Sequence, residues 1–285
     1  MLFVCFNKAL AGHLREQAPV ERLHVFHFHS LCVHWAKRAG VELPVYDGEP
    51  PAAFWEEELP DALVEAIGVT GPPYDDILVD EAQDLHTDWL VALTCTMRDE
   101  DDGSIWLFMD DNQRVYDSKL EVSRDYARFD LDVNCRNTQA IHREVMKLYE
   151  GAVKPRVQGP PGRDAELVFA RDEPATVAAP VARLCREDDI RPQDIVVLSS
   201  HGREKSEVYA AGLGDGLRFS DKRVGRGVYF SSIRGFKGLE SPVVVLCELG
   251  DLDDETRNRQ LYVGMSRARN HCVVVAPQPE TKPSD

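Results

Sequence analysis

Short runs of Val, Ile, Leu and Phe recur along the chain and alternate with segments whose apolar residues repeat at the helical period. Such apolar runs are typical of parallel strands that helices cover on both faces. Predicted helices span residues 8–16 and 30–39, and the second ends at Gly40. The pattern therefore predicts an α/β protein. The clearest predicted strands are residues 2–6, 24–28, 77–79, 105–109, 194–198, 228–232, 243–247 and 272–275.

Proline and glycine indicate where the chain divides. A length of 285 residues allows one large or two medium domains. The segment 151–164 (GAVKPRVQGPPGRD) is rich in both residues, which favours a linker between an N-terminal lobe, residues 1–150, and a C-terminal lobe, residues 165–285. Further prolines predict a short insertion of loops around one helix within about residues 40–75.

Composition narrows the classes of function. The chain has 33 Lys and Arg against 49 Asp and Glu, a net charge of −16, which excludes binding of nucleic acid through bulk positive charge. Any contact with nucleic acid must then be local. Seven scattered cysteines without a CxxC pair favour reduced thiols over disulfides or zinc. No apolar run is long enough to span a bilayer and no signal peptide is visible, so we expect a cytoplasmic protein without membrane insertion.

The strongest chemical signal is an acidic pair directly after an apolar run. Residues 77–84 read ILVDEAQD, so Asp80 and Glu81 emerge at the carboxyl end of a predicted parallel strand, where open α/β sheets bind ligands. Mg²⁺ bound to nucleotide phosphates takes one or two carboxylates, and a neighbouring acid can orient the attacking water of phosphoryl transfer. The alternative, which stays open at this point, is a helix N-cap with acids in the first turn.

The octet resembles motif II of superfamily 1 helicases of the UvrD/Rep type. Other segments resemble the remaining motifs of that family, in the family's order, and together cover about residues 2–275. These segments are 6–10 (FNKAL, motif Ia), 28–30 (FHS, Ib), 110–116 (DDNQRVY, III), 134–138 (NCRNT, IV), 232–240 (SIRGFKGLE, V) and 260–269 (QLYVGMSRAR, VI). The resemblance implies two RecA-like lobes of the P-loop NTPase type. It also implies an ATP-dependent 3′ to 5′ DNA helicase or translocase that uses ATP and Mg²⁺ and binds single-stranded DNA.

The resemblance implies catalytic roles for five residues. Asp80 would hold Mg²⁺, and Glu81 would act on the attacking water. Gln113 could hold that water or donate to the γ-phosphate without adding charge. Arg136 and Arg267, always cationic, would stabilise charge on the transferring γ-phosphoryl group.

Further residues are expected to contact the nucleotide or the DNA strand. In the family the segment 237–240 (KGLE) faces both the nucleotide and the DNA backbone, so Gly238 and Glu240 are expected at the nucleotide. A second aromatic often follows the motif III tyrosine in the family, and its absence here predicts a weaker grip on DNA. Tyr262 is expected in the core. The residues that the resemblance places at DNA are Asn7, Lys8, His29, Ser30, Tyr116 and Lys237.

The chain contains no GxxxxGK[ST] run, the phosphate-binding loop of this family. Without that loop no backbone cradle, lysine or hydroxyl serves the phosphates and Mg²⁺. Because Met1 begins inside what resembles the motif Ia strand, we expect a first lobe that lacks its phosphate-loop strand and a motor that is inactive alone. Three explanations stay open: a fragment, a split protein in which another polypeptide supplies the missing strand and loop, or a decayed helicase. The last would be a non-catalytic binding module for single-stranded DNA or a protein partner.

The missing strand has a structural consequence in the fold that the resemblance implies. It would lie beside the predicted strand 105–109 (IWLFM), which would then become an edge without charge, proline or bulge. We expect such an edge to recruit another strand by dimerising, aggregating or binding a partner. The motif Ia, II and III strands are expected to pair directly with one another.

Overall fold

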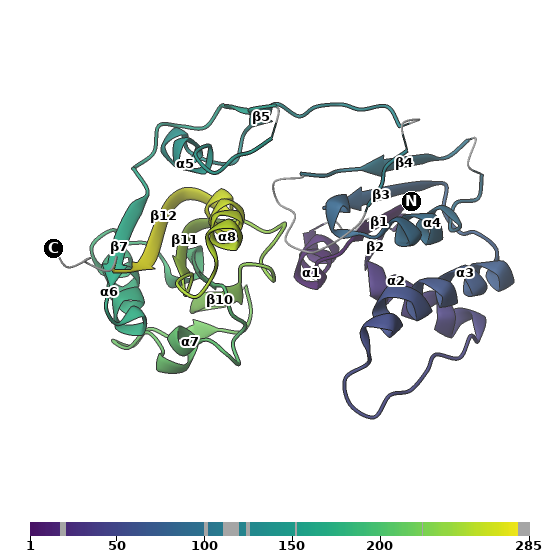
Figure 1. The fold of residues 1–285 in the computed structure, drawn as a ribbon, viewed down its shortest axis with the longest axis horizontal. Helices are drawn as coiled ribbons and strands as arrows, with labels where there is room; N and C mark the ends of the chain where they lie inside the picture. The colour runs from purple at the N-terminus through teal and green to yellow at the C-terminus, as the bar shows by residue number, and fades with distance from the viewer. Residues whose placement is uncertain are drawn as a thin grey trace, which may run out of the picture. The chain divides into compact units, whose positions relative to one another are not determined.

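The computed structural model divides into two compact units, Met1–Arg128 and Phe129–Asp285. Each unit contains a parallel sheet with helices packed on it (Figure 1), which confirms the α/β class. In the described part of the chain, no helix has both the length and the apolar character needed to cross a membrane. The structure describes residues 1–17, 21–99, 102–110, 120–123, 126–151, 153–223 and 225–278.

The first unit contains a four-stranded sheet in the order β2-β1-β3-β4, in which every neighbouring pair is parallel. Its strands are β1 (Leu2–Cys5), β2 (His24–His27), β3 (Asp76–Asp80) and β4 (Ser104–Leu107). Its helices are α1 (Lys8–Gln17), α2 (Phe28–Ala39), α3 (Leu59–Thr70) and α4 (Thr87–Thr94), with a π-helical turn at Phe54–Glu58 and a 3-10 turn at Ala82–Asp84. The motif Ia, II and III strands therefore pair directly with one another, as predicted.

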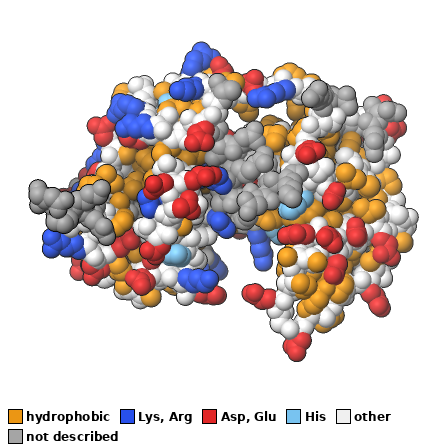
Figure 2. Space-filling model, in the orientation of Figure 1, with side chains coloured by type: hydrophobic (Ala, Val, Ile, Leu, Met, Phe, Trp, Pro, Cys, Tyr) orange, Lys and Arg blue, Asp and Glu red, His pale blue; other side chains and the backbone are white. Residues whose placement is uncertain are grey.

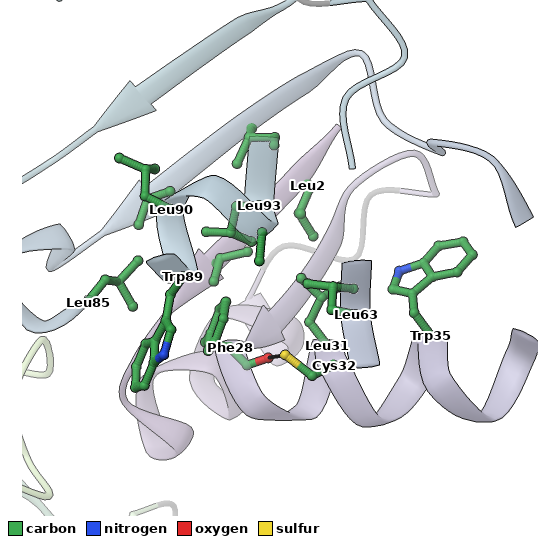
Figure 3. Packing of buried hydrophobic residues seen from close by; sticks show 14 of the residues in the cluster. Leu2, Phe28, Leu31, Cys32, Trp35, Leu63, Leu85, Trp89, Leu90 and Leu93 are labelled. Carbon is green, nitrogen blue, oxygen red and sulfur yellow. Dashed lines mark hydrogen bonds between the residues drawn. The ribbon is translucent and has the colours of Figure 1, made fainter. Parts of the chain in front are cut away.

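The core of the first unit lies on one face of this sheet. Phe28 of α2 stacks on Trp89 of α4 with ring centroids 4.7 Å apart and planes 10° apart, amid leucines from α2, α3 and α4 (Figure 3). The Trp89 indole N–H donates to the Glu56 carbonyl at 2.9 Å, so the π-helical turn is tied to α4. This packing fixes the α2 and α4 ends that flank the carboxyl edge of the sheet.

The second unit contains a six-stranded parallel sheet in the order β7-β12-β11-β8-β10-β9. Its strands are β7 (Glu166–Ala170), β8 (Ile195–Ser199), β9 (Phe219–Ser220), β10 (Val228–Ser232), β11 (Ser241–Cys247) and β12 (Ala268–Pro277), and a separate pair is β5 (Val133–Asn134) with β6 (Arg156–Val157). Its helices are α5 (Gln139–Val145), α6 (Glu173–Arg186), α7 (Glu207–Ala211) and α8 (Asp254–Ser266), with a 3-10 turn at Pro192–Asp194.

Both faces of the second sheet are covered. Helix α6 packs on the face that includes Val197 and Val245, while α8 contacts β11 and β12 and α5 contacts β12. Strand β8 is buried at every position, and β11 at all but one. This two-sided burial is the reason why the central strands appear in the sequence as continuous apolar runs.

The domain boundary differs from the prediction, because the contacts divide the chain after Arg128 instead of near residue 150. The buried Asn137 side chain donates to the carbonyls of Ser266 and Ala268 at 3.1 and 2.6 Å, so the motif IV segment belongs to the second unit. The predicted linker 151–164 instead packs on this segment. A Cβ at Gly159 would lie 1.9 Å from the Asn137 carbonyl oxygen, so glycine serves close packing there and not flexibility.

Strand β4 lies at one edge of the first sheet, as predicted, and pairs with β3 alone among the described strands. The regular strand ends at Leu107 instead of Met109, although the Phe108 N–H still donates to the Val79 carbonyl at 2.8 Å. Trp106, Phe108 and Met109 are 50%, 41% and 42% exposed. This edge of the first sheet is therefore apolar and accessible.

Candidate functional site

Asp80 and Glu81 lie at the carboxyl end of β3, as the sequence predicts. Asp80 is the last residue of the strand, and its Oδ1 accepts the Glu81 N–H at 3.0 Å. Glu81 has φ 53° and ψ 43°, a left-handed conformation that is rare for residues other than glycine. The backbone thus turns sharply between the strand and the 3-10 turn. Glu81 stands at the N-cap position of that turn, but its side chain makes no cap hydrogen bond, and helix α4 begins only at Thr87.

Gln83 orients the Glu81 carboxylate. This glutamine is fully buried, and its side-chain N–H donates to Glu81 Oε2 at 2.6 Å while its Oε1 accepts the Asp110 N–H at 3.1 Å. One side chain therefore fixes the acid after β3 and the backbone after β4. Sequence reasoning gave Gln83 no role, although a glutamine so soon after a buried strand is a signal that could have found it.

The acids at the end of β3 adjoin the end of β1, because Cys5 pairs in register with Asp80. Burial, and next the charge of Asp80, raises the pKa of the Cys5 thiol to about 12. Asn7 caps the following helix, with Oδ1 accepting the N–H groups of Ala9 and Leu10 at 2.8 and 3.1 Å. Lys8 is the exposed first residue of α1. The structure therefore brings the motif Ia and motif II residues to one edge of the sheet.

The motif Ib residues make bonds within the first unit. His29 is only 8% exposed, its Nε2 lies 3.0 Å from the Trp55 carbonyl, and its ring contacts Trp89 edge-on at 4.9 Å. Burial, followed by the nearby His27, lowers the pKa of His29 to about 4. Ser30 Oγ donates to the His27 carbonyl at 2.6 Å. These side chains stabilise the start of α2, and their contact with DNA stays a prediction.

In the second unit, Arg136 and Glu240 are 104 residues apart in the chain and form an ion pair, Nε to Oε2 at 2.8 Å. Arg269 adds a longer contact to Glu240 at 3.6 Å. The Arg136 and Glu240 side chains are 37% and 38% exposed, so this pair is accessible to a charged ligand. The structure thus brings together one predicted catalytic residue and one predicted nucleotide contact.

Arg267 and Lys237 are each only 1% exposed. Arg267 ends α8, where its Nε donates to the Val263 carbonyl at 3.2 Å and its NH2 group donates to Ser266 Oγ at 3.3 Å. Gly238 has φ +79°, a conformation that favours glycine. Tyr262 is buried, as predicted.

Two predicted residues, Gln113 and Tyr116, lie outside the described residues. In the ranges that the structure describes, no group of three or more His, Cys, Asp and Glu could hold a metal ion by itself. The donors at the end of β3 are hard carboxylate oxygens, which suit Mg²⁺ when phosphate and water supply its remaining ligands. Asp80 could therefore supply one carboxylate ligand of Mg²⁺, with phosphate and water as the others, although the described residues offer no complete set of ligands there.

Comparison with known proteins gives one match to a domain family and structural similarities of low score. Residues 227–275 match the UvrD-like helicase C-terminal domain, and no curated protein matches the chain. One similar solved structure is the C-terminal domain of a possible DNA helicase from Lactobacillus plantarum WCFS1, with 21% identity over 50% of this chain and 87% of that one, at a TM-score of 0.41. Another is the PRRSV helicase, with 13% identity over 98% of this chain and 52% of that one, at 0.44.

The domain match covers β10, β11, α8 and most of β12 of the second unit. It includes the segment 232–240, the helix before Arg267, and Arg267 itself. The chain spans about half the length of the PRRSV helicase structure. The second unit thus carries a match to the UvrD-like helicase C-terminal domain over residues 227–275.

Proposed function

We propose that this chain is the motor core of an ATP-dependent DNA helicase or translocase of the UvrD/Rep type, moving 3′ to 5′ on single-stranded DNA. The observation that carries the proposal is the acidic pair at the carboxyl end of β3. There Asp80 ends the strand, and the buried Gln83 holds the Glu81 carboxylate. A fixed carboxylate beside one that could hold Mg²⁺ can position the attacking water for phosphoryl transfer.

The residues of the first unit would divide the work at the nucleotide. Bound Mg²⁺ would neutralise charge on the nucleotide phosphates. Asp80 would hold the ion, directly or through water. Glu81 would accept a hydrogen bond from the attacking water, and Gln83 would keep Glu81 from rotating away. Gln113 would hold the same water or the γ-phosphate.

The cations of the second unit would stabilise the charge of the phosphoryl group. Arg136 is paired with Glu240, and an exposed pair of this kind contributes only about 0–1 kcal/mol. A phosphate can therefore compete for Arg136 at little cost. Arg267, which is only 1% exposed, would also stabilise charge on the phosphoryl group, and Gly238 and Glu240 would contact the nucleotide. The first-unit residues proposed to position the DNA strand are Asn7, Lys8, His29, Ser30 and Tyr116, and Lys237 is proposed to do so from the second unit.

One observation favours a second candidate, a non-catalytic binding module: no GxxxxGK[ST] run occurs in the 285 residues. We propose that the chain alone hydrolyses ATP at background rate and needs a polypeptide segment that supplies this loop. The test joins the chain to a segment that bears the loop and measures ATP hydrolysis with and without single-stranded DNA. A motor core will show DNA-stimulated turnover that Glu81→Gln abolishes.

The matched control is Glu65→Gln, which removes an exposed carboxylate from α3 of the same unit and should leave turnover unchanged. DNA binding without turnover, in the presence of the loop, would support the binding module. Turnover that survives Glu81→Gln would show that this acid has no catalytic role.

A further inference from the structure

The cations of the second unit are unevenly paired. Most of its Lys and Arg side chains bond to a carboxylate or another polar group. Four of the exceptions fall within residues 205–226, in a chain whose net charge is −16. The exposed cations that lack such a partner, among the described residues 129–278, are Lys154, Lys205, Arg218, Lys222 and Arg226.

The connection between β9 and β10 brings three of these cations together. The two strands are parallel neighbours joined by residues 221–227 only, whereas a parallel pair ordinarily needs a connection of about a dozen residues. Ser220 Oγ closes the loop by accepting the Lys222 N–H at 3.2 Å and donating to its carbonyl at 2.7 Å. A Cβ at Gly227 would lie 2.6 Å from the Arg218 carbonyl oxygen, so the end of the loop packs tightly against the start of β9.

Arg203 holds the same loop from the segment after β8. Its guanidinium donates to the carbonyls of Ser220 and Phe230 at 3.4 and 3.0 Å and pairs with Asp221 at 2.8 Å. Asp221 is thereby neutralised and does not cancel the charge of the exposed cations. These bonds place the segment that carries Lys205 next to the β9–β10 loop.

Arg223 ties the loop to the segment before β11. Its NH2 group donates to the Glu240 carbonyl at 2.8 Å, and burial lowers its pKa. Its other terminal nitrogen, NH1, is buried without a hydrogen-bond partner. Arg223 therefore serves the fold and joins the loop to the segment 232–240, which resembles helicase motif V. The exposed cations beside it remain available to a ligand.

Aromatic rings lie between these cations. Tyr209, Phe219 and Tyr229 are each partly exposed, and the first two stack with centroids 5.4 Å apart at 23°. The Arg203 guanidinium lies 5.6 Å from the Tyr209 ring centroid and 5.9 Å from that of Tyr229. Cations interleaved with aromatic rings are the combination that proteins use to bind single strands, through phosphates and stacked bases.

We propose that exposed Lys222 and Arg226 of the β9–β10 loop, together with Arg218 just before β9 and neighbouring Lys205, bind the phosphate backbone of single-stranded nucleic acid. The proposal deepens the proposed function and rests on it for the class of ligand. None of these cations is among the residues that are expected to contact DNA at β1, at β2 and at Lys237. Because the whole chain is acidic, a local cluster of unpaired cations is the kind of surface that binding of a polyanion requires.

The test measures binding of a fluorescent oligothymidylate to the full chain by anisotropy over a range of salt concentrations. The variant combines Lys222→Gln with Arg226→Gln, and the matched control is Lys154→Gln, an exposed unpaired cation outside the cluster. Each phosphate contact on a single strand contributes about 0.7 to the slope of log K against log salt. The double variant should lower that slope by about 1.4 and weaken binding about tenfold at low salt. The control should change binding less than twofold.

The outcomes separate this surface from the proposed function. If the wild-type chain binds DNA and the double variant binds equally well, the assignment of this binding surface is wrong while the proposed function stands. If the wild-type chain binds no single strand at all, the DNA-binding part of the proposed function fails with it. An equal loss in Lys154→Gln would show a general charge effect and overturn the assignment. Unchanged DNA binding with loss of self-association in the double variant would identify an acidic surface of a second copy as the ligand.

Discussion

The two units share a parallel α/β architecture but differ sharply in charge. Residues 1–128 contain 10 Lys and Arg against 25 Asp and Glu, whereas residues 129–285 contain 23 against 24. Acidic side chains are spread over the α2 and α3 face of the first unit, with apolar ones between them (Figure 2). The net charge of the chain thus comes almost entirely from the first unit. The second unit is balanced, so small groups of its cations can attract an anion.

The sheets differ in a related way. Burial alternates along β3, so the first sheet has one fully buried face, while β8 of the second sheet is buried at every position. All four tryptophans, Trp35, Trp55, Trp89 and Trp106, lie in the first unit. Tryptophan fluorescence therefore follows its unfolding separately from that of the second unit.

The largest expected effect concerns the second unit. Asn137→Ala leaves the buried carbonyls of Ser266 and Ala268 without their donor, which should lower the free energy of unfolding by about 2–4 kcal/mol. Hydrogen exchange of β11 and β12 amides should become faster, while the tryptophan transition should stay in place. Asn258→Ala on the exposed face of α8 is the control and should be nearly neutral. A matching shift in the tryptophan transition would show that the two units unfold as one.

Acid should destabilise the first unit next most strongly. Burial lowers the pKa of both His27 and His29 to about 4, from an ordinary value of 6.5. As the pH falls, these histidines are therefore protonated in the unfolded state before they are in the folded state. The free energy of unfolding is highest above pH 6.5 and falls as the pH approaches 4. The loss should be on the order of a few kcal/mol, seen by tryptophan fluorescence in denaturant. His29→Gln should flatten this pH dependence, and an unchanged slope would show that His29 does not contribute.

A smaller effect is expected at the acidic edge of the first sheet. Gln83→Leu removes the donor to Glu81 and the acceptor of the Asp110 N–H, which should cost about 1–3 kcal/mol. Tryptophan fluorescence should report the loss, and the Asp110 amide should lose protection from hydrogen exchange. The second unit should be unaffected. Gln17→Leu, at the exposed end of α1, is the control.

These contacts also show what a sequence can predict. The strands of both sheets were predictable because buried parallel strands form continuous apolar runs, and the position of Asp80 and Glu81 followed from β3. The partnership of Arg136 with Glu240 was not predictable from spacing, because tertiary structure alone joins residues 104 apart. The domain boundary was misplaced for a related reason, since glycines near residue 159 suggest flexibility but serve close packing against Asn137.

The smallest effect on stability should accompany a change at the accessible edge of the first sheet. Phe108 is 41% exposed and follows β4, whose outer edge has no partner among the described strands. An apolar open edge favours pairing with another chain, and a lysine there opposes it. Phe108→Lys should lower self-association in analytical ultracentrifugation while changing the free energy of unfolding by about 0.5 kcal/mol or less, as surface substitutions do. Val45→Lys, at a site that is 97% exposed in a loop of the same unit, adds the same charge and should leave association unchanged.

A wild-type chain that stays monomeric at high concentration, with amides 105–109 protected from exchange, would mean that another part of the protein covers this edge. The first sheet would then have a covered edge, and it would differ less from the second sheet in solvent exposure.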